Sequence, residues 1–399
     1  MPKKEQKPQI RFKGFTDDWE QRKVSELAER YDNLRVPVAA NLRVPGNTPY
    51  YGANGIQDYV TGYTHDGEYI LVAEDGANDL KNYPVNYVNG RIWVNNHAHV
   101  LQGKKKISSN RFLSYAISLV DIESVLVGGG RAKLNAEVMM NLDVKLPSYG
   151  EQTKIGAFFS KLDNLITLHQ RKYEKLKNIK KSMLEKMFPK NENKIPEIRF
   201  KGFTDDWEQR KLDDIADDIA DGPFGSNLKA EHYTEEKEAR IVQLSNIGET
   251  GWHDENVKYT TFTHAREISR SIVTPNSLIM AKMMPAGMTI ICPNADKMYV
   301  LSSDAVKIKL KNNINATYFV SMTKSKEFLQ QIDCDAQGST RTRTSISKIR
   351  KMNVPVPELS EQTKIGAFFS KLDNLITLHQ RKYEKLKNIK KSMLEKMFV

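Results

Sequence analysis

Two related loops hold the residues of this sequence that are best suited to contact phosphates or base edges. The loop QGSTRTRTSISKIRK at 337–351 is rich in Gly, Ser, Thr and Arg. Backbone N–H groups and hydroxyls of such a loop can meet phosphate oxygens, and Arg can make a bidentate contact to guanine. The pattern therefore predicts a DNA-contacting loop, although an ordinary solvated loop can have the same composition.

A similar loop lies at the matching position of the first half, because sliding the halves over each other by 210 residues aligns Gly128 with Gly338. The same shift aligns Arg131 with Arg341 and Lys133 with Arg343. Ser345 suits the N-cap of the helix expected after the second loop. The candidate DNA contacts in the two loops are Arg131, Lys133, Asn135, Ser339, Thr340, Arg341, Arg343, Ser345 and Lys348.

Two turns supply weaker candidates. The aromatic and glycine-containing turn YYGANG at 50–55 offers Tyr51 and Asn54, and the stretch DGPFGSNLK at 221–229 offers Ser226 and Lys229. Gly, Asn, Asp and Pro are favoured in turns for conformational reasons alone, so turn chemistry is a sufficient explanation for both.

Catalytic signatures are missing from the sequence. The dipeptide Gly103-Lys104 is followed by Lys105 and lacks the upstream Gly of a phosphate-binding loop. The sequence also lacks an Asn/Asp-Pro-Pro-aromatic methylase signature and a Pro-Asp…Glu/Asp-x-Lys nuclease pattern. The run Asn95-Asn96-His97-Ala98-His99 has no carboxylate or cysteine at a metal-ligand spacing, which favours a structural role. We expect no catalytic, cofactor-binding or metal-binding residues in this chain.

The positive charge is concentrated in two segments. The 399 residues carry a net charge of +12. Residues 151–188 contain nine basic and four acidic side chains, and 361–398 contain the same set, so these two segments hold ten of the twelve excess charges. The regions between them are close to neutral, so any DNA contact there must come from local patches rather than from a general basic surface.

The composition also bears on the cellular compartment. The sequence has no run of 18 apolar residues, and its start, MPKKEQKPQIRF, is unlike a signal peptide. Cys292 and Cys334 form neither a CxxC pair nor a disulfide framework. We expect a soluble, cytoplasmic protein.

Two exact repeats organise the chain. The segment EQTKIGAFFSKLDNLITLHQRKYEKLKNIKKSMLEKMF occurs at 151–188 and at 361–398, and IRFKGFTDDWEQRK occurs at 10–23 and at 198–211. The chain is therefore a tandem duplication of one module, in which the regions between the repeats have diverged. The expected parts are a first variable domain at 1–150, a long helix at 151–190, a second variable domain at 191–360 and a second long helix at 361–399.

The long repeat predicts a helix of roughly 57 Å, since it has no Pro and its single Gly lies in the first turns. Apolar or aromatic residues recur at steps of three and four, and only Lys180 interrupts the series. This spacing is that of a heptad seam. Each helix is expected to pair with the other copy. The residues expected to pair the helices or dock other subunits are Ile155, Phe159, Leu162, Ile166, Tyr173, Leu176, Met183, Ile365, Phe369, Leu372, Ile376, Tyr383, Leu386 and Met393.

Two alternatives accompany this interpretation. A solvated surface helix with an apolar underside has a similar pattern, but helices beyond 25 residues without internal caps favour coiled coils. The identity of the two copies indicates that both helices do the same job, and a recent duplication or recombination would produce the same identity.

The variable regions are typical of a mixed α/β structure. Strand-like runs occur at EYILVA (68–73), RIWVNN (91–96), ARIVQL (239–244) and SLIMAK (277–282), separated by turn signals. Each half ends in the same order of elements, with a short helix, a strand that ends in Pro, and the long helix.

The shared elements resemble a known family. The motif Glu-Gln-x-x-Ile stands at Glu151–Ile155 after Pro147, and again at Glu361–Ile365 after Pro357. In both copies an Asp, Asp163 or Asp373, follows the Ile by eight residues. Together with DGPFGSNLK and the duplicated layout, this arrangement is similar to the DNA-specificity subunit of type I restriction-modification enzymes, over essentially the whole chain.

The resemblance implies a fold and a function. It implies two α/β target recognition domains, each reading one half of a bipartite, asymmetric site in double-stranded DNA. It also implies that the two long helices form an antiparallel, pseudo-two-fold coiled coil that sets the gap between the half-sites. Two modification subunits with S-adenosylmethionine, and two restriction subunits with ATP and Mg, would complete the enzyme around a chain that holds no cofactor. An alternative from another class is a coiled-coil adaptor whose flanking domains bind proteins.

Overall fold

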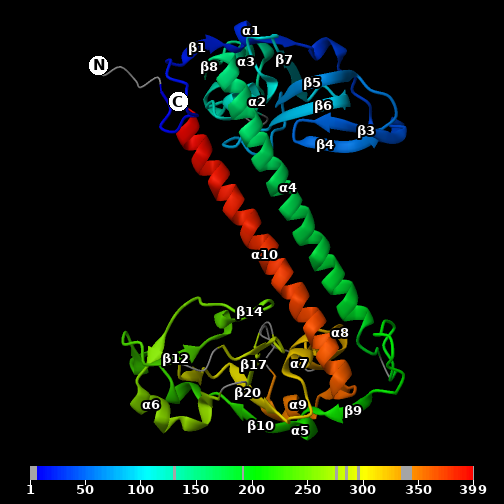
Figure 1. Ribbon diagram of the computed structural model, residues 1–399, viewed down its shortest axis with the longest axis vertical. Coiled ribbons are helices and arrows are strands. Elements are labelled where there is room, and N and C mark those ends of the chain that lie inside the picture. The colour runs from blue at the N-terminus through cyan, green and yellow to red at the C-terminus, as the bar shows by residue number, and fades with distance from the viewer. Residues whose placement is uncertain are drawn as a thin grey trace. The chain divides into compact units, whose positions relative to one another are not determined.

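The computed structural model describes residues 7–128, 132–190, 193–274, 277–283, 286–293, 297–333 and 344–398. The chain forms two compact units, the first from 1–169 and 382–399 and the second from 170–381 (Figure 1). The two predicted long helices are confirmed as α4 (Tyr149–Lys186) and α10 (Leu359–Met397). Each begins two residues before its repeat and contributes to both units.

The first unit is built on one six-stranded sheet. Its β3 and β6 are parallel and the other neighbours are antiparallel. The apolar run predicted at 68–73 lies in β5, whose last five residues are all buried, as expected for a central strand covered on both faces. The strand order is β2 (Ala28–Arg30), β7 (Ala98–Gly103), β5 (His65–Ala73), β6 (Val85–Val94), β3 (Pro45–Gly52) and β4 (Gly55–Val60).

Short helices complete the first unit. Helix α2 (Asn110–Ser118) contacts β5 and β6 and buries its apolar face in the core. Helix α1 (Val24–Leu27) and helix α3 (Ala136–Met140) also contact each other. The core therefore lies between the sheet and α2, and it continues onto the long helices.

The second unit has two larger sheets. In one, all neighbouring strands are antiparallel, in the order β10 (Ala216–Asp221), β20 (Ala305–Leu310), β17 (Leu278–Ala281) and β18 (Thr289–Ile291). In the other, β12 and β19 are parallel. Its order is β11 (Tyr233–Thr234), β15 (Tyr259–Thr260), β12 (Ala239–Val242), β19 (Tyr299–Leu301) and β16 (Ile272–Val273).

The remaining elements of the second unit are short. They include α5 (Leu212–Ile215), β13 (Ile247–Gly248), β14 (Gly251–Trp252), α6 (Phe262–Glu267), α7 (Ala316–Met322), α8 (Lys326–Asp333) and α9 (Ile346–Lys351). The fully buried strands β12 and β17 correspond to the predicted runs at 239–244 and 277–282. Within the described part of the chain, no helix has the length and apolarity needed to cross a membrane.

Each variable region is inserted at the same point of a repeated frame. The strands β1 (Glu20–Lys23) and β8 (Asp143–Leu146) pair antiparallel, as do β9 (Glu208–Lys211) and β21 (Asn353–Val356). Just beyond each pair, the next backbone N–H donates to the carbonyl that precedes the partner strand: Val24 to Leu142, and Leu212 to Met352. The regions 24–142 and 212–352 are therefore structurally equivalent insertions.

The repeated Glu-Gln pair fastens each variable region to its long helix. Buried Glu151 accepts two 2.8 Å hydrogen bonds from Arg11, and Glu361 accepts the same pair from Arg199. Gln152 accepts from the Ser109 N–H and donates to the carbonyls of Ile107 and Pro147. Gln362 makes the equivalent bonds with Asn315, Asn313 and Pro357. Identical residues thus build the same joint twice.

The start of one long helix packs on the end of the other in each unit, so the helices are antiparallel. In the first unit, Phe159 contacts Phe398, with ring centroids 5.9 Å apart. In the second unit, Phe369 and Phe188 are 5.9 Å apart. Of the residues predicted to pair, the buried ones are Ile155, Phe159, Leu162, Ile365, Phe369, Leu372 and Ile376. The half-buried ones are Ile166, Tyr173, Leu176, Met183, Tyr383, Leu386 and Met393.

The lysine that interrupts the apolar series has a partner on the opposite helix. Lys180 is buried, and its Nζ lies 2.5 Å from an Asp373 oxygen in the second unit. In the first unit, Lys390 Nζ lies 2.6 Å from Asp163. The interruption is therefore one polar pair, repeated in both units, rather than a defect of the seam.

Candidate nucleic-acid interface

In the first unit, the turn at 74–79 brings two predicted loops together. The Asn54 side chain donates to the Gly76 carbonyl and accepts from the Asn78 N–H, both at 2.9 Å. Lys133 forms a backbone bridge with Asp75, and its Nζ lies 3.0 Å from a Glu74 oxygen. We call Asn54, 74–79, 127–128 and 132–135 the first loop cluster.

A charged network supports this cluster. Arg35 Nη1 lies 2.6 Å from Glu74, which also contacts Lys133. Burial alone would raise the pKa of Glu74, but hydrogen bonds from Arg35 and Lys133 outweigh burial and hold that pKa below its ordinary value. The ring of buried His99 lies between Asp32, 2.7 Å from Nδ1, and the Leu134 carbonyl, 2.9 Å from Nε2. The base of the loop is thereby fixed.

Asp32, Glu74 and His99 also form a group that could hold a metal ion, since one ligand atom of each lies within 4.8 Å of the others. Arg35 already contacts both carboxylates, at 3.6 Å from Asp32 and 2.6 Å from Glu74. A divalent cation in that place would be repelled by the guanidinium. The arrangement therefore fits ion-paired support of the loop better than metal binding.

The other first-half candidates have different environments. Tyr51 lies in β3 and packs against buried residues of the sheet, so it contributes to the core. Burial raises the pKa of Tyr51, and Tyr59 adds a smaller effect. Asn135 is exposed and precedes α3; among the described contacts, its side chain makes no cap hydrogen bond. Lys133 is 46% exposed despite its ion pair, and Arg131 lies outside the described residues.

In the second unit, Lys282 joins the two predicted segments. Its side chain is only 7% exposed, and its Nζ lies 2.6 Å from Asp221, at the start of the DGPFGSNLK stretch. Its carbonyl accepts from the Thr344 N–H at 3.0 Å, just before α9. A cavity of about 720 Å³ lies beside this link, lined in part by Phe224, Arg270 and Ile346. We call 221–229, 269–271, Lys282 and 344–348 the second loop cluster.

Sequence reasoning missed Phe224, Arg270 and Lys282. Phe224 is 82% exposed, and an exposed aromatic ring can stack on a base. Its position between Pro and Gly in a polar turn could have drawn attention to it. Lys282 gave no such signal, because its run MAKMMPAGM is mostly apolar and its partners are distant in the sequence.

The remaining second-half candidates that the structure describes lie at the surface. As predicted, Ser345 caps α9, accepting from the Lys348 N–H at 3.3 Å. Lys348 is exposed on the first turn of that helix. Ser226 donates to Asn227, and Lys229 Nζ lies 3.7 Å from Glu231. Ser339, Thr340, Arg341 and Arg343 lie outside the described residues.

Comparison with known proteins identifies the family. The family model of the type I restriction modification DNA specificity domain matches residues 16–178 and 204–388. The chain belongs to this family. Both matched ranges cover one variable region and most of the long helix that follows it, so the duplication seen in the sequence is a duplication of the specificity domain.

Individual relatives agree with this assignment. A protein of Haemophilus influenzae named as a type I restriction enzyme specificity subunit is 43% identical over 144 residues, which cover 36% of this chain and 37% of that protein. A type I restriction enzyme specificity subunit of Methanocaldococcus jannaschii is 21% identical over 95% of this chain and 91% of its own. The crystal structure of the S subunit of a type I restriction-modification system from M. genitalium has a TM-score of 0.71 at 14% identity, covering 98% of this chain and 99% of that one.

Membership of the family establishes the general role. A type I specificity subunit recognises DNA sequence, and the catalytic activities of the system reside in other subunits. The predicted resemblance and the predicted two-domain α/β architecture with long paired helices are confirmed. DNA and other restriction-modification subunits are therefore the partners of this specificity subunit.

Proposed function

We propose that each loop cluster of this specificity subunit reads one half of a bipartite, asymmetric site in double-stranded DNA. The observation that carries the proposal is that two different loop clusters stand on equivalent frames, because 24–142 and 212–352 are inserted between equivalent strand pairs. Equivalent frames present different reading surfaces in the same way to the two halves of the DNA.

The paired helices, in this proposal, set the gap between the half-sites and dock two modification subunits. The same helix sequence, with the same Glu-Gln joint, occurs once in each half and offers the same surface twice. Identical partners bind such a repeated surface equivalently. The modification subunits would supply S-adenosylmethionine-dependent adenine methylation, and two restriction subunits would add ATP- and Mg-dependent translocation and cleavage.

The exposed side chains of the clusters suit DNA contact. Lysines such as Lys133 and Lys348 suit phosphates, Asn135 suits adenine, and Arg270 suits guanine. The ring of Phe224 can stack on a base. These local groups matter because the variable regions carry little net charge, so general attraction to DNA is weak there.

A duplicated chain tests the half-site assignment. Residues 212–352 are replaced by a second copy of 24–142, and the variant is expressed with the modification subunits. Mapping methylated adenines across the cellular DNA should reveal a palindromic site, made of two inverted copies of the first half-site with the original gap. The reciprocal duplication of 212–352 should give the other palindrome. Assembled duplicated chains that still methylate the original asymmetric site would overturn the proposal.

A lengthened chain tests the spacing role. Seven residues added to both α4 and α10 keep the apolar seam in phase and lengthen each helix by roughly 10 Å. At about 3.4 Å per base pair, the gap should grow by about three base pairs while both half-sites stay the same. An active enzyme with the old gap would contradict this role of the helices.

A further inference from the structure

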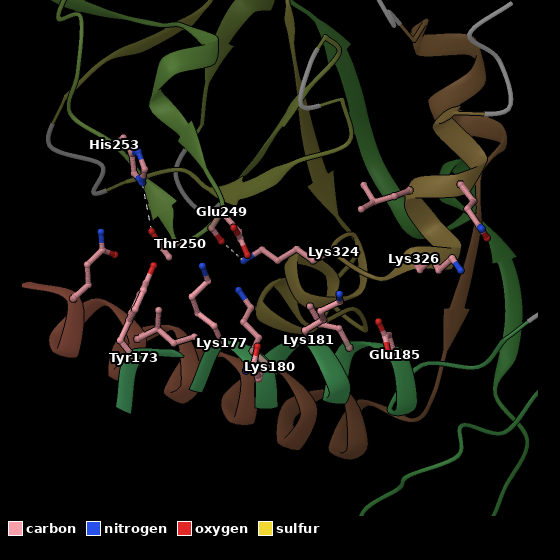
Figure 2. A pocket seen from close by; sticks show the side chains of 16 residues that line it. Tyr173, Lys177, Lys180, Lys181, Glu185, Glu249, Thr250, His253, Lys324 and Lys326 are labelled. Atoms are coloured by element: carbon pink, nitrogen blue, oxygen red, sulfur yellow. Dashed lines mark hydrogen bonds between the residues drawn. The ribbon is translucent and has the colours of Figure 1, made fainter. Parts of the chain in front are cut away.

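A lysine-rich cavity lies in the second unit, and none of its lining residues belongs to the second loop cluster. It is a cavity of about 960 Å³ lined by α4, α10, the turn between β13 and β14, and the segment 324–330 (Figure 2). Figure 2 shows Lys177 and Lys180 rising from α4 toward the turn that carries Glu249, and Lys324 reaching that turn from another element. Five lysines line the cavity: Lys177, Lys180, Lys181, Lys324 and Lys326.

Two of these lysines are buried together. The side chains of Lys180 and Lys324 are 5% and 8% exposed, and both contact Asp373, at 2.5 and 3.2 Å. Lys324 also donates to the Glu249 carbonyl at 2.7 Å. Burial lowers the pKa of Lys324, and repulsion from Lys180 lowers it further. One carboxylate thus has to balance two ammonium groups that water reaches poorly.

The whole cavity carries an excess of positive charge. Among the residues that line it, Glu185 and Glu249 carry carboxylates, and the carboxylate of Asp373 pairs with two of its lysines. Five lysines against three carboxylates leave two positive charges in excess. Lys177, Lys181 and Lys326 are exposed, so their ammonium groups can reach a ligand in the cavity.

The first unit lacks the equivalent lysines at these positions. Gln152 and Gln362 bind the N-caps Ser109 and Asn315, which align α2 with α7. Counting nine residues from each cap pairs Ser118 with Lys324, and two residues further Val120 pairs with Lys326. The long helices are identical, so the second variable region is what turns this place into a cavity rich in lysine.

We propose that this cavity binds phosphate groups of the DNA backbone, without regard to base sequence and apart from the two loop clusters. The proposal rests on the proposed function, which makes DNA the ligand of this chain. Lysine ammonium groups bind phosphate as point charges and read no sequence. The volume exceeds what a single small anion fills and lies in the range of nucleotide-sized sites, so the site suits successive backbone phosphates.

The test removes two exposed lysines and compares two places in identical helices. Lys177→Gln/Lys181→Gln changes the cavity, and Lys387→Gln/Lys391→Gln removes the same charges from the matching positions of α10. In both helices the first of these lysines lies over a Tyr ring, at 5.1 Å for Lys177 and 5.3 Å for Lys387, so the two local environments are alike. Each variant is assembled with the modification subunits and bound to duplexes with and without the recognised site, over a range of salt concentrations.

For the cavity variant, the plot of log K against log salt should become less steep by about one to two for both duplexes, at roughly 0.9 for each phosphate that the protein no longer neutralises. The methylated sequence should stay the same, and the slope of the control variant should stay close to wild type. No change in the cavity variant, or an equal change in both variants, would overturn the proposal.

A second variant and a second ligand make the test sharper. Lys324→Ser introduces the residue found at the equivalent position 118 and should make the slope less steep by about one. Calorimetric titration of the full chain with tripolyphosphate probes a free-phosphate source. Saturable binding that Lys177→Gln/Lys181→Gln abolishes, with no change in the DNA slope, would overturn the assignment to DNA. If the phosphate proposal is wrong, the salt dependence of DNA binding stays unchanged in the cavity variant. If the half-site proposal is wrong, the duplicated chains still methylate the original sequence.

Discussion

Asp163 and Asp373 occupy the same position in two identical helices, yet they have different partners. Asp163 accepts from the Tyr115 hydroxyl at 2.6 Å and pairs with Lys390. Asp373 pairs instead with Lys180 and Lys324, and its side chain is 17% exposed against 38% for Asp163. The helix repeat supplies one lysine in both units, and the variable region supplies the second partner.

The exact repeats make the packing around the long helices alike in the two units, but they leave the electrostatic surroundings of each Asp different. The Phe–Phe contact between the long helices and the Glu-Gln joint recur in both units, because the groups involved belong to the repeats or to the backbone around them. The charge around each Asp differs, because α2 supplies the Tyr115 hydroxyl in the first unit, whereas the segment that follows α7 supplies Lys324 in the second. Identical segments can therefore serve one platform while the two units acquire separate binding properties.

The largest expected effect comes from separating the two halves. A fragment of residues 1–190 keeps Phe188 but lacks Phe398, which stacks on Phe112 with ring centroids 5.4 Å apart. A second fragment can place its identical Phe188 in that position, so the fragment should dimerise symmetrically. With modification subunits, the dimer should direct methylation to a palindrome of the first half-site. Sedimentation and methylation mapping check both outcomes.

The control for the fragment is the same chain with Phe188→Ala, which removes the ring that would complete the core of the other copy. This variant should dimerise more weakly or remain monomeric. A soluble monomer from the unaltered fragment, or a dimer that Phe188→Ala leaves intact, would show that the two helix ends are not interchangeable.

The next prediction concerns the loss of unfolding free energy when the same Phe ring is removed from each unit, at Phe188 or at Phe398. Phe188 is 1% exposed between Trp207, Tyr318 and Phe369, so Phe188→Ala should lower the free energy of unfolding of the second unit by about 3–5 kcal/mol. Phe398 is only half-buried, so Phe398→Ala should cost the first unit less. Denaturant unfolding, monitored in variants that retain only Trp19 or only Trp207, separates the two units. Equal losses would mean that the ends pack alike despite their different exposure.

The Asp comparison leads to a smaller but more specific prediction. Asp373→Asn leaves two poorly hydrated ammonium groups without a countercharge and should destabilise the second unit by about 3 kcal/mol. Asp163→Asn loses one partly exposed ion pair and should cost about 1 kcal/mol or less. Chemical denaturation of both variants measures the difference. Equal costs would show that Lys324 adds nothing to the environment of Asp373.

Much of the fold could be predicted from the sequence because its signals are local. The long helices follow from apolar residues spaced three and four apart within a 38-residue segment, and the strands β5, β12 and β17 follow from short apolar runs. The pairing of Lys180 with Asp373 could not be predicted, because periodicity marks the lysine as an interruption and does not show which side chain lies opposite. The order of strands in each sheet could not be predicted either, since it depends on contacts between segments that are distant in the sequence.

The candidate site could be predicted only in part, for the same reason. The Ser345 cap was recognisable because its hydrogen bond spans three residues. The turn around Asn54 suggests a DNA contact, but the Asn54 amide holds the turn at 76–78, which the local pattern does not show. Lys282 joins Asp221 to Thr344, a link across more than a hundred residues that no motif encodes.

The pH dependence of the second unit tests the environment of Lys324. Its pKa lies below the ordinary value of 10.5, first because of burial and then because of Lys180, while Asp373 and Glu249 partly oppose the shift. Between that lowered pKa and 10.5, the unfolded chain binds more protons than the fold, so this lysine makes the fold more stable as the pH rises. Unfolding measured from pH 8 to 10.5 should show wild type gaining stability relative to Lys324→Ser. The matching Ser118→Ala variant of the first unit should show no such trend.

The smallest expected change in stability comes from the residues that precede α9 and α3. Ser345 and Asn135 hold corresponding N-cap positions, but Ser345 accepts a hydrogen bond from the Lys348 N–H, whereas the structure describes no side-chain cap bond for Asn135. Ser345→Ala should therefore lower the free energy of unfolding of the second unit by about 1 kcal/mol, and Asn135→Ala should change the first unit by a few tenths at most.

DNA binding adds a second measurement to this pair. If Asn135 is exposed because it reads a base, Asn135→Ala should relax the methylated sequence at one position of the first half-site while leaving stability intact. Ser345→Gly, which keeps most of the capping preference, should recover most of the stability lost in Ser345→Ala. A stability loss at Asn135 equal to that at Ser345, with unchanged methylation sites, would show that both residues are caps. Asn135 and Ser345 would then have the same role in the two loop clusters, although only Ser345 makes a described cap hydrogen bond.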